Sequence, residues 1–117
     1  MTTQELDQAL NQQVLGGDIM GAFEKFYAED VVMRENSEEP IPGKAANRER
    51  ELQFVGSIAA IHGASVVSSA INGDTSFSEW AMDVTFQGGV RVSMAQVAVR
   101  TWKDGLVVRE RFYYNKG

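Results

Sequence analysis

The chain has 117 residues, 11 of them basic and 16 acidic, so its formal net charge is −5. This length, with an ordinary apolar content of 44%, predicts one globular domain spanning residues 1–117. The chain contains no cysteine and one histidine, His62, which excludes disulfides, thiolate nucleophiles and cysteine-rich or multi-histidine metal sites within one chain. The acidic balance disfavours a nucleic-acid partner, since such proteins normally present a basic surface.

The first residues and the apolar runs indicate a cytoplasmic protein. The segment from Met1 to Asp7 has neither the basic region nor the apolar region of a signal peptide. No apolar stretch approaches the roughly 18 residues that a membrane-spanning helix needs. We therefore expect no membrane partner, and no motif in the sequence calls for a metal or a cofactor.

Hydrophobic periodicity predicts that the first half of the chain is mostly helical. In the third predicted helix, Leu52, Val55 and Ile58 recur at three-residue steps and are expected to be buried. The charged residues 48–51 are expected mainly on the solvent-exposed side of that helix. The predicted helices cover residues 4–15, 18–30 and 44–58, with a short strand at 31–33 and a loop at 35–43.

The second half of the chain changes to a two-residue period, which predicts β-strands. Alternation over residues 76–87 places Trp80 and Met82 on one face and Glu79 and Asp83 on the other. The predicted strands cover residues 64–71, 76–87, 90–102 and 106–114, with turns at Asn72-Gly73, Gly88-Gly89 and Lys103-Asp104-Gly105. Helices followed by long hairpin-connected strands indicate an α+β fold, with three N-terminal helices packed on a strongly curved antiparallel β-sheet.

Short motifs occur in a recognisable order along nearly the whole chain. They are Gly17-Asp18-Ile19-Met20-Gly21, Phe26-Tyr27-Ala28-Glu29-Asp30-Val31, Pro42-Gly43-Lys44, Gly73-Asp74, Glu79-Trp80, Trp102-Lys103-Asp104-Gly105 and Arg111-Phe112-Tyr113-Tyr114. In this order and spacing they resemble the SnoaL-like proteins of the NTF2-like superfamily. The resemblance implies a cone with a pocket in its open end, and often a homodimer through the outer sheet face. It implies no single activity, because this fold hosts isomerases, cyclases, dehydratases, binding modules and adaptors.

Residues expected on the inner face of the cone are the candidates for binding a ligand. Most are methionine or aromatic, and such side chains adapt to flat apolar molecules or stack on them, although ordinary core packing is the alternative for each. Gln96 and Arg100 share the strand parity of Met94, so both are expected to point inward, and Arg100 near the rim would bind a carboxylate. The candidates are Phe23, Met33, Phe54, Trp80, Met82, Met94, Gln96, Trp102 and Phe112.

Catalysis depends on polar groups inside the cone. By the resemblance, Glu35 stands where isomerase-type relatives carry their general base, and a buried carboxylate there suits proton abstraction beside a carbonyl. The alternative is a solvated loop acid beside Glu38 and Glu39.

Other positions argue against isomerase chemistry. The resemblance places Leu10 where those enzymes carry a tyrosine, and Val97 to Val99 where they carry a neutral acid, so both stabilisers of an enolate are missing. The related cyclases use an acid and a histidine at the pocket, but His62, predicted just after the third helix, is expected at the surface. The last strand ends in Tyr114-Asn115, where many relatives have Tyr-Asp.

Three functions follow, in order of preference. The first is binding of a small, mostly apolar or aromatic molecule in the cone, without chemistry. The second is a polyketide-cyclase- or ketosteroid-isomerase-like enzyme with Glu35 as general base. The third is a dimeric interaction scaffold whose outer face carries Ala95, Val97, Val99 and Thr101. On that face, cross-strand pairs are expected to join Arg109 and Arg111 to Glu79, Asp83 or Glu110.

Overall fold

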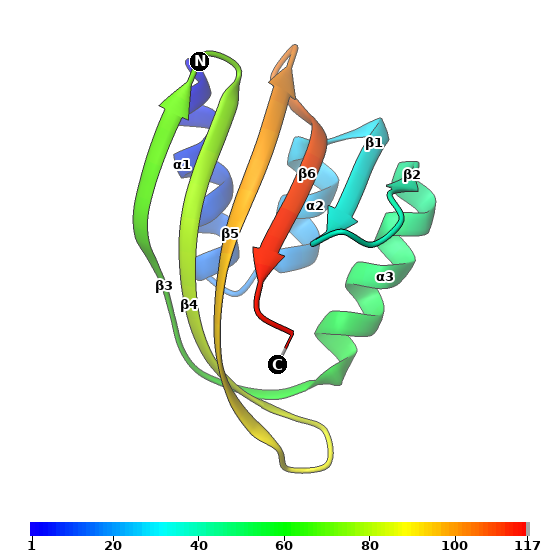
Figure 1. The fold of residues 1–117 in the computed structure, drawn as a ribbon, viewed down its shortest axis with the longest axis vertical. Coiled ribbons are helices and arrows are strands. Elements are labelled where there is room, and N and C mark those ends of the chain that lie inside the picture. The colour runs from blue at the N-terminus through cyan, green and yellow to red at the C-terminus, as the bar shows by residue number, and fades with distance from the viewer. Residues whose placement is uncertain (117) are drawn as a thin grey trace.

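Three helices and six strands make up the fold, which a computed structural model describes for residues 1–116 (Figure 1). Helices α1 and α2 come first, and α3 separates the short strand β2 from four long strands. The elements are α1 (Thr3–Leu15), α2 (Ile19–Phe26), β1 (Tyr27–Glu35), β2 (Ile41–Pro42), α3 (Lys44–Ser57), β3 (Ile58–Asn72), β4 (Thr75–Phe86), β5 (Arg91–Lys103) and β6 (Leu106–Tyr114). No helix in the described part of the chain is long and apolar enough to cross a membrane.

Side-chain caps define where the first two helices begin. Thr2 and Glu5 form a reciprocal capping box at the start of α1. The Asp18 carboxylate accepts a hydrogen bond from the Gly21 amide, 3.0 Å away, at the start of α2. α2 ends at Phe26, so the prediction of a helix continuing to Asp30 is wrong. The chain enters β1 at Tyr27 instead, because this segment pairs with β6, a partner that lies far along the sequence and leaves no local pattern.

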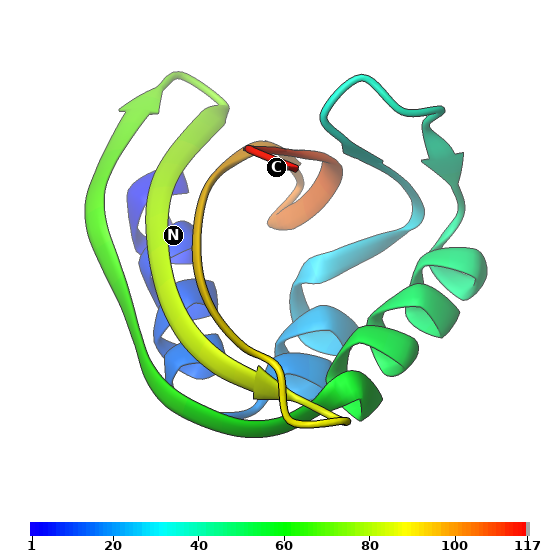
Figure 2. The ribbon, with the colours of Figure 1, turned by 60° about the horizontal axis from the view of Figure 1, so that its bottom comes forward.

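The sheet is mixed rather than wholly antiparallel. Its strand order is β2-β1-β6-β5-β4-β3, and every neighbouring pair is antiparallel except β1 and β6, which run parallel. The pairing of β3 with β4 shifts register at three points, and such bulges bend and twist a strand. β3 starts at Ile58, earlier than the predicted residue 64. Figure 2 shows the resulting sheet curled around the helices without closing on itself.

The hydrophobic core lies where α1 and α2 pack against the sheet. Phe26 meets Trp102 edge to face at 6.2 Å between ring centroids, and Phe23 stacks on Tyr27 at 4.8 Å. Val31 and Val107 are fully buried in the same cluster. Trp102 therefore belongs to the packed core.

Buried polar groups fix the position of α3 relative to the sheet. Lys44 donates hydrogen bonds to the backbone carbonyls of Glu24 and Tyr27, at 2.9 and 2.8 Å, where α2 passes into β1. The Asn47 amide nitrogen donates to the carbonyls of Ile41 and Gly43, at 2.9 and 2.8 Å. These bonds hold one end of α3 while the rest of the helix faces the concave side of the sheet (Figure 2).

The face that α3 turns inward differs from the predicted one. Leu52 is 48% exposed, although the three-residue pattern indicated that it would be buried. The inward face instead carries Asn47, Arg50, Glu51 and Phe54, at the spacing of one helical stripe. The charged side chains predicted to face solvent are thus partly directed into the molecule, because α3 borders a cavity rather than a packed core.

Candidate functional site

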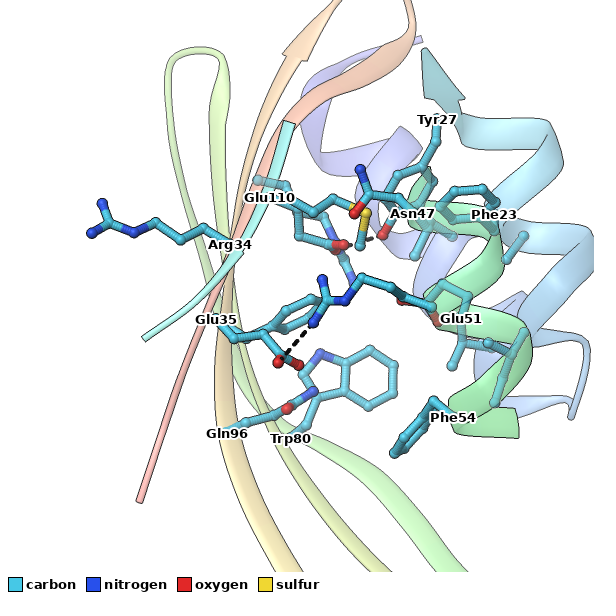
Figure 3. Close-up of a pocket in the computed structure, with 18 of the residues that line it drawn as sticks. Phe23, Tyr27, Arg34, Glu35, Asn47, Glu51, Phe54, Trp80, Gln96 and Glu110 are labelled. Atoms are coloured by element: carbon cyan, nitrogen blue, oxygen red, sulfur yellow. Dashed lines mark hydrogen bonds and ion pairs between the residues drawn. The ribbon is translucent and has the colours of Figure 1, made fainter. Parts of the chain in front are cut away.

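A cavity of about 510 Å³ lies between α3, α2 and the concave face of the sheet (Figure 3). This volume falls within the range of roughly 300–1,000 Å³ that is typical of small-molecule sites. The lining residues come from every layer of the fold: Leu10, Val14, Ile19, Ala22, Phe23, Tyr27, Met33, Arg34, Glu35, Asn47, Arg50, Glu51, Gln53, Phe54, Trp80, Met82, Met94, Gln96, Arg100, Glu110, Phe112 and Tyr114.

The structure brings together most of the side chains that strand parity and helical spacing selected. Those that line the cavity are Phe23, Met33, Phe54, Trp80, Met82, Met94, Gln96 and Phe112, together with Glu35. Trp102 does not line it, because its indole is buried in the core and donates to the Ser76 hydroxyl at 3.0 Å. The parity argument placed Trp102 on the correct face, but α1 and α2 cover that end of the strand.

The floor of the cavity is a buried network of charged and polar groups centred on Arg100. Its guanidinium lies 2.6 Å from the Glu110 carboxylate and 2.9 Å from the Asp7 carboxylate, and it also donates to the side-chain oxygen of Asn11, Oδ1, at 2.7 Å. The Tyr27 hydroxyl donates to Glu110. The network therefore ties α1 to β5, β6 and the start of β1 through one cation.

Both carboxylates of this network are buried, and the position of Glu110 overturns a sequence-based expectation. Asp7 lies on α1, is 2% exposed and also accepts from the Ser76 hydroxyl at 2.8 Å. Glu110 was expected on the outer face, and it is likewise 2% exposed. Glu110 lies opposite Arg100 in the β5–β6 register, so the two charges meet on the inner face. Arg100 points inward as predicted, but the carboxylates that it binds belong to Asp7 and Glu110 and not to a ligand.

Burial and neighbouring charge act in opposite directions on this cluster. Burial disfavours the charge on Arg100, but the negative groups around it, Tyr27 when ionised, Glu110 and Asp7, raise its pKa above the usual value. Burial, followed by the Glu110 charge, raises the pKa of Tyr27 well above its usual value. Arg100 therefore stays a cation and Tyr27 a neutral hydrogen-bond donor at all ordinary pH values.

At the mouth of the cavity, Glu35 forms an ion pair with Arg50. One Arg50 nitrogen lies 2.9 Å from a Glu35 carboxylate oxygen, and both side chains are about one-third exposed (Figure 3). Glu35 ends β1 and Arg50 lies on α3, so the pair joins the rim of the sheet to the helix. Of the two alternatives for Glu35, a residue at the cavity or an acid in a solvated loop, the structure does not show the loop. Glu35 is the last residue of β1, and its side chain borders the cavity.

Glu51 is the acid that the sequence analysis missed. Its side chain lines the cavity from α3, and burial raises the pKa of its carboxyl to about 7. The Glu110 and Glu35 carboxylates raise it further, whereas Arg50 and Arg100 oppose the shift. A carboxyl with this pKa changes protonation state near neutral pH, so it can accept or donate a proton in the cavity.

The remaining polar candidates lie away from the cavity. His62 is an exposed residue of β3, bonded to the Thr85 hydroxyl at 2.7 Å, rather than a residue at a helix end. Asp83 pairs with Arg91, and Arg111 donates to the Asn36 carbonyl at 2.8 Å, so neither follows the predicted outer-face pairing. Within residues 1–116, no group of three histidine, cysteine or acidic side chains is placed to hold a metal ion.

Comparison with known proteins identifies the family. The profile of the SnoaL-like domain matches residues 1–114, almost the whole chain. The chain belongs to the SnoaL-like family. No protein of curated function matches it significantly.

Solved structures share the fold over nearly the full length. A protein from Mesorhizobium loti, assigned as a SnoaL-like polyketide cyclase, is 35% identical, with a TM-score of 0.84 over 97% of this chain and 100% of its own. A protein from Bacillus subtilis assigned as an isomerase is 21% identical, with a TM-score of 0.82 over 98% and 90%. A further cyclase assignment, from Jannaschia sp. CCS1, is 15% identical, with a TM-score of 0.82 over 97% and 85%. The curved α+β fold of this SnoaL-like protein is therefore established, while the assignments of its neighbours differ.

Replacing Arg100 tests the buried network. Arg100→Met leaves Asp7 and Glu110 buried without their cation, and such a loss costs about 3–5 kcal/mol of unfolding free energy. Urea denaturation followed by circular dichroism measures the difference. Arg91→Met is the control, because its pair with Asp83 is solvent-exposed and its loss is expected to leave the midpoint nearly unchanged. Equal stability of Arg100→Met and the wild type would contradict this account of the floor.

Replacing Glu51 tests the elevated pKa. A carboxyl with a raised pKa in the folded state binds more protons there than in the unfolded chain, so the stability it contributes falls as pH rises from about 4.5 to about 7. Glu51→Gln removes this loss, and we expect it to stabilise the protein by about 1–3 kcal/mol at pH 8 and much less at pH 4.5. Glu49→Gln, on the exposed face of the same helix, is the control. A Glu51→Gln effect that does not depend on pH would count against a raised pKa.

Proposed function

We propose that this SnoaL-like protein binds a small, mostly apolar or aromatic molecule in the cavity between α3 and the sheet. The observation that carries the proposal is the cavity itself, about 510 Å³ with methionine and aromatic walls. Met33, Met82 and Met94 adapt to irregular apolar shapes, and the faces of Phe54 and Trp80 suit a flat ring system. The apolar walls supply the affinity, and the few polar groups at the floor and the mouth select the ligand's orientation.

The second candidate function is proton transfer beside a carbonyl, with Glu35 as general base. The observation in its favour is that Glu35 borders the cavity and is oriented by Arg50 at 2.9 Å. Against it, Leu10 supplies no hydroxyl, and the buried acid Glu110 is already engaged by Arg100 and Tyr27. Neither of these two residues offers a free donor to a developing oxyanion, so binding remains the preferred function.

Filling the cavity tests the binding function. Met94→Trp adds bulk to the cavity wall, and we expect it to weaken binding of a neutral aromatic probe, 1-naphthylmethanol, by about tenfold or more. Isothermal titration calorimetry measures the affinity. The matched control is Ser93→Trp, because Ser93 is exposed on the opposite face of the same strand. Binding that survives Met94→Trp but is lost in Ser93→Trp would place the site elsewhere.

We also propose that two copies associate through the outer face of the sheet. Along β5 this face carries Ala95, Val97, Val99 and Thr101, whose small side chains allow close approach of a second sheet. Tyr113 of β6, at 44% exposure, extends the apolar surface beside Val97, its register partner. Exposed apolar surface of this kind is typical of an association site.

Introducing a charge on this face tests the dimer. Val97→Glu places an unpaired carboxylate at the centre of the proposed interface, which we expect to shift a dimer toward a monomer at micromolar concentration. Light scattering coupled to size-exclusion chromatography measures the molar mass. The control is Glu79→Gln, a polar change at the position paired with Val97 on β4. A wild-type protein that is monomeric under these conditions would refute the proposal and the scaffold function with it.

A further inference from the structure

The polar end of the cavity contains one carboxyl without a partner. In the described part of the chain, no cation forms an ion pair with Glu51 and no side chain donates a hydrogen bond to it, although the residue is partly buried at the cavity. Figure 3 shows Glu51 between Asn47 and Phe54 on α3, on the side of the helix that borders the cavity. Buried carboxylates are normally paired, so this one is available to a group that enters the cavity.

Two further acceptor atoms at the cavity are unused. Glu110 is 2% exposed, and its Oε1 has no hydrogen-bond partner, since Arg100 and Tyr27 both bind Oε2. Asn47 is fully buried, and its Oδ1 also has no partner. The orientation of the Asn47 amide is fixed, because its nitrogen donates to two backbone carbonyls. The residues that line this end of the cavity therefore hold unused acceptors on both α3 and β6.

The charges around this end do not balance. Arg34 borders the cavity too, but its guanidinium is turned away and bonded to the Ser37 and Glu38 carbonyls (Figure 3). The charged groups that remain, with Asp7 counted because it pairs with Arg100, are four carboxylates and two guanidinium groups: Asp7, Glu35, Glu51 and Glu110 against Arg50 and Arg100. The excess is two negative charges when Glu51 is ionised and one when it is protonated.

We propose that the cavity binds a cationic amine carried on an apolar, aromatic body, with the Glu51 carboxylate as its counter-ion. An ammonium group supplies both features that this end of the cavity lacks, a positive charge and several N–H donors. The aromatic walls add attraction, because a cation near the face of Trp80 or Phe54 is stabilised by the ring. This inference rests on the proposed binding function and names its ligand class.

A neutral carbonyl compound is the competing occupant, and its lack of hydrogen-bond donors argues against it. Such a ligand would accept a hydrogen bond from protonated Glu51, but it would leave Glu110 Oε1 and Asn47 Oδ1 without donors. With Glu51 protonated, three carboxylates and two guanidinium groups remain, so this ligand also leaves one negative charge in excess. An ammonium ion instead neutralises the charge of ionised Glu51 and brings N–H donors to an end of the cavity that holds unpaired acceptors, so the two ligand classes differ in the affinity they are expected to show.

Protonation of Glu51 couples amine binding to pH. The groups that act on Glu51 are Glu110 on β6, Glu35 on β1, Arg50 on its own helix and Arg100 on β5. In the protein without a ligand, the pKa of Glu51 is about 7, and an ammonium ion binds only to the ionised Glu51 carboxylate. Amine affinity is therefore expected to rise about tenfold or more between pH 5.5 and pH 8, and binding at pH 6 to release a proton.

The test compares three probes of the same shape by isothermal titration calorimetry: 1-naphthylmethylamine, 1-naphthylmethanol and 1-naphthoate. In the wild type at pH 8, the amine is expected to bind about tenfold more tightly than the alcohol, and the carboxylate most weakly. In Glu51→Gln, the preference for the amine over the alcohol is expected to fall to about twofold or less, and its pH dependence to disappear. Glu49→Gln, on the exposed face of α3, is expected to retain both.

The outcomes separate this inference from the function on which it rests. Equal or tighter binding of the alcohol or the carboxylate in the wild type leaves the binding function in place and overturns the amine proposal. An amine preference that persists in Glu51→Gln also overturns it. Failure of all three probes to bind overturns both. Because Glu51→Gln conserves shape and is expected to stabilise the fold at pH 8, lost amine preference in a variant that still binds the alcohol is not a folding defect.

Discussion

Arg100 holds a positive charge at a place that water hardly reaches, and the arrangement of the inner side of this SnoaL-like protein depends on it. A buried cation is costly unless carboxylates and hydrogen-bond acceptors surround it. Asp7 on α1 and Glu110 on β6 meet that need from opposite sides, at 2.9 and 2.6 Å. The first helix is thereby fixed to the last two strands, and this fixed floor defines how deep the cavity extends.

The same requirement explains why the cavity is polar at one end and apolar at the other. Charged groups that neutralise Arg100 gather at the floor, while α3 adds Glu51 without adding a cation that pairs with it. Away from the floor, Trp80, Met82 and Phe54 line walls without charge. An apolar site with a local excess of negative charge discriminates among ligands more by charge than by size. Its methionine side chains can adjust to ligands of different shape, whereas its hydrogen-bond acceptors are held in fixed positions.

Much of the fold could be predicted because most helices and strands follow from the spacing of apolar residues that are close in sequence. Alternation along residues 76–87 correctly placed Trp80 inward, and the period-two pattern of β5 did the same for Met94 and Gln96. The mixed character of the sheet was not predictable in this way, because β1 pairs in parallel with β6, more than 70 residues away. Local periodicity also misassigned Tyr27, which begins a strand and not the last turn of a helix.

Three acids of the site were missed for a different reason. Acidic residues are almost always exposed, so Glu51 was assigned to the solvent side of its helix and Glu110 to the outer face of the sheet, and no inward position was predicted for Asp7. The spacing contained contrary information. Glu110 lies two residues before the inward-facing Phe112 on one strand, and Glu51 lies three residues before Phe54 on one helix. Strand parity and helical spacing were better guides to burial here than polarity, because these carboxyls surround a buried arginine and a cavity.

The central claim is that the cavity holds an acid whose charge is suppressed by burial and by its neighbours. Carboxyl-carbon NMR of the protein labelled with ¹³C-glutamate, assigned with Glu51→Gln and titrated over pH 4–9, measures this directly. The account predicts that the Glu51 resonance titrates with a midpoint of about 7. A Glu51 midpoint near 4.5, the ordinary value for a solvated glutamate, would contradict it.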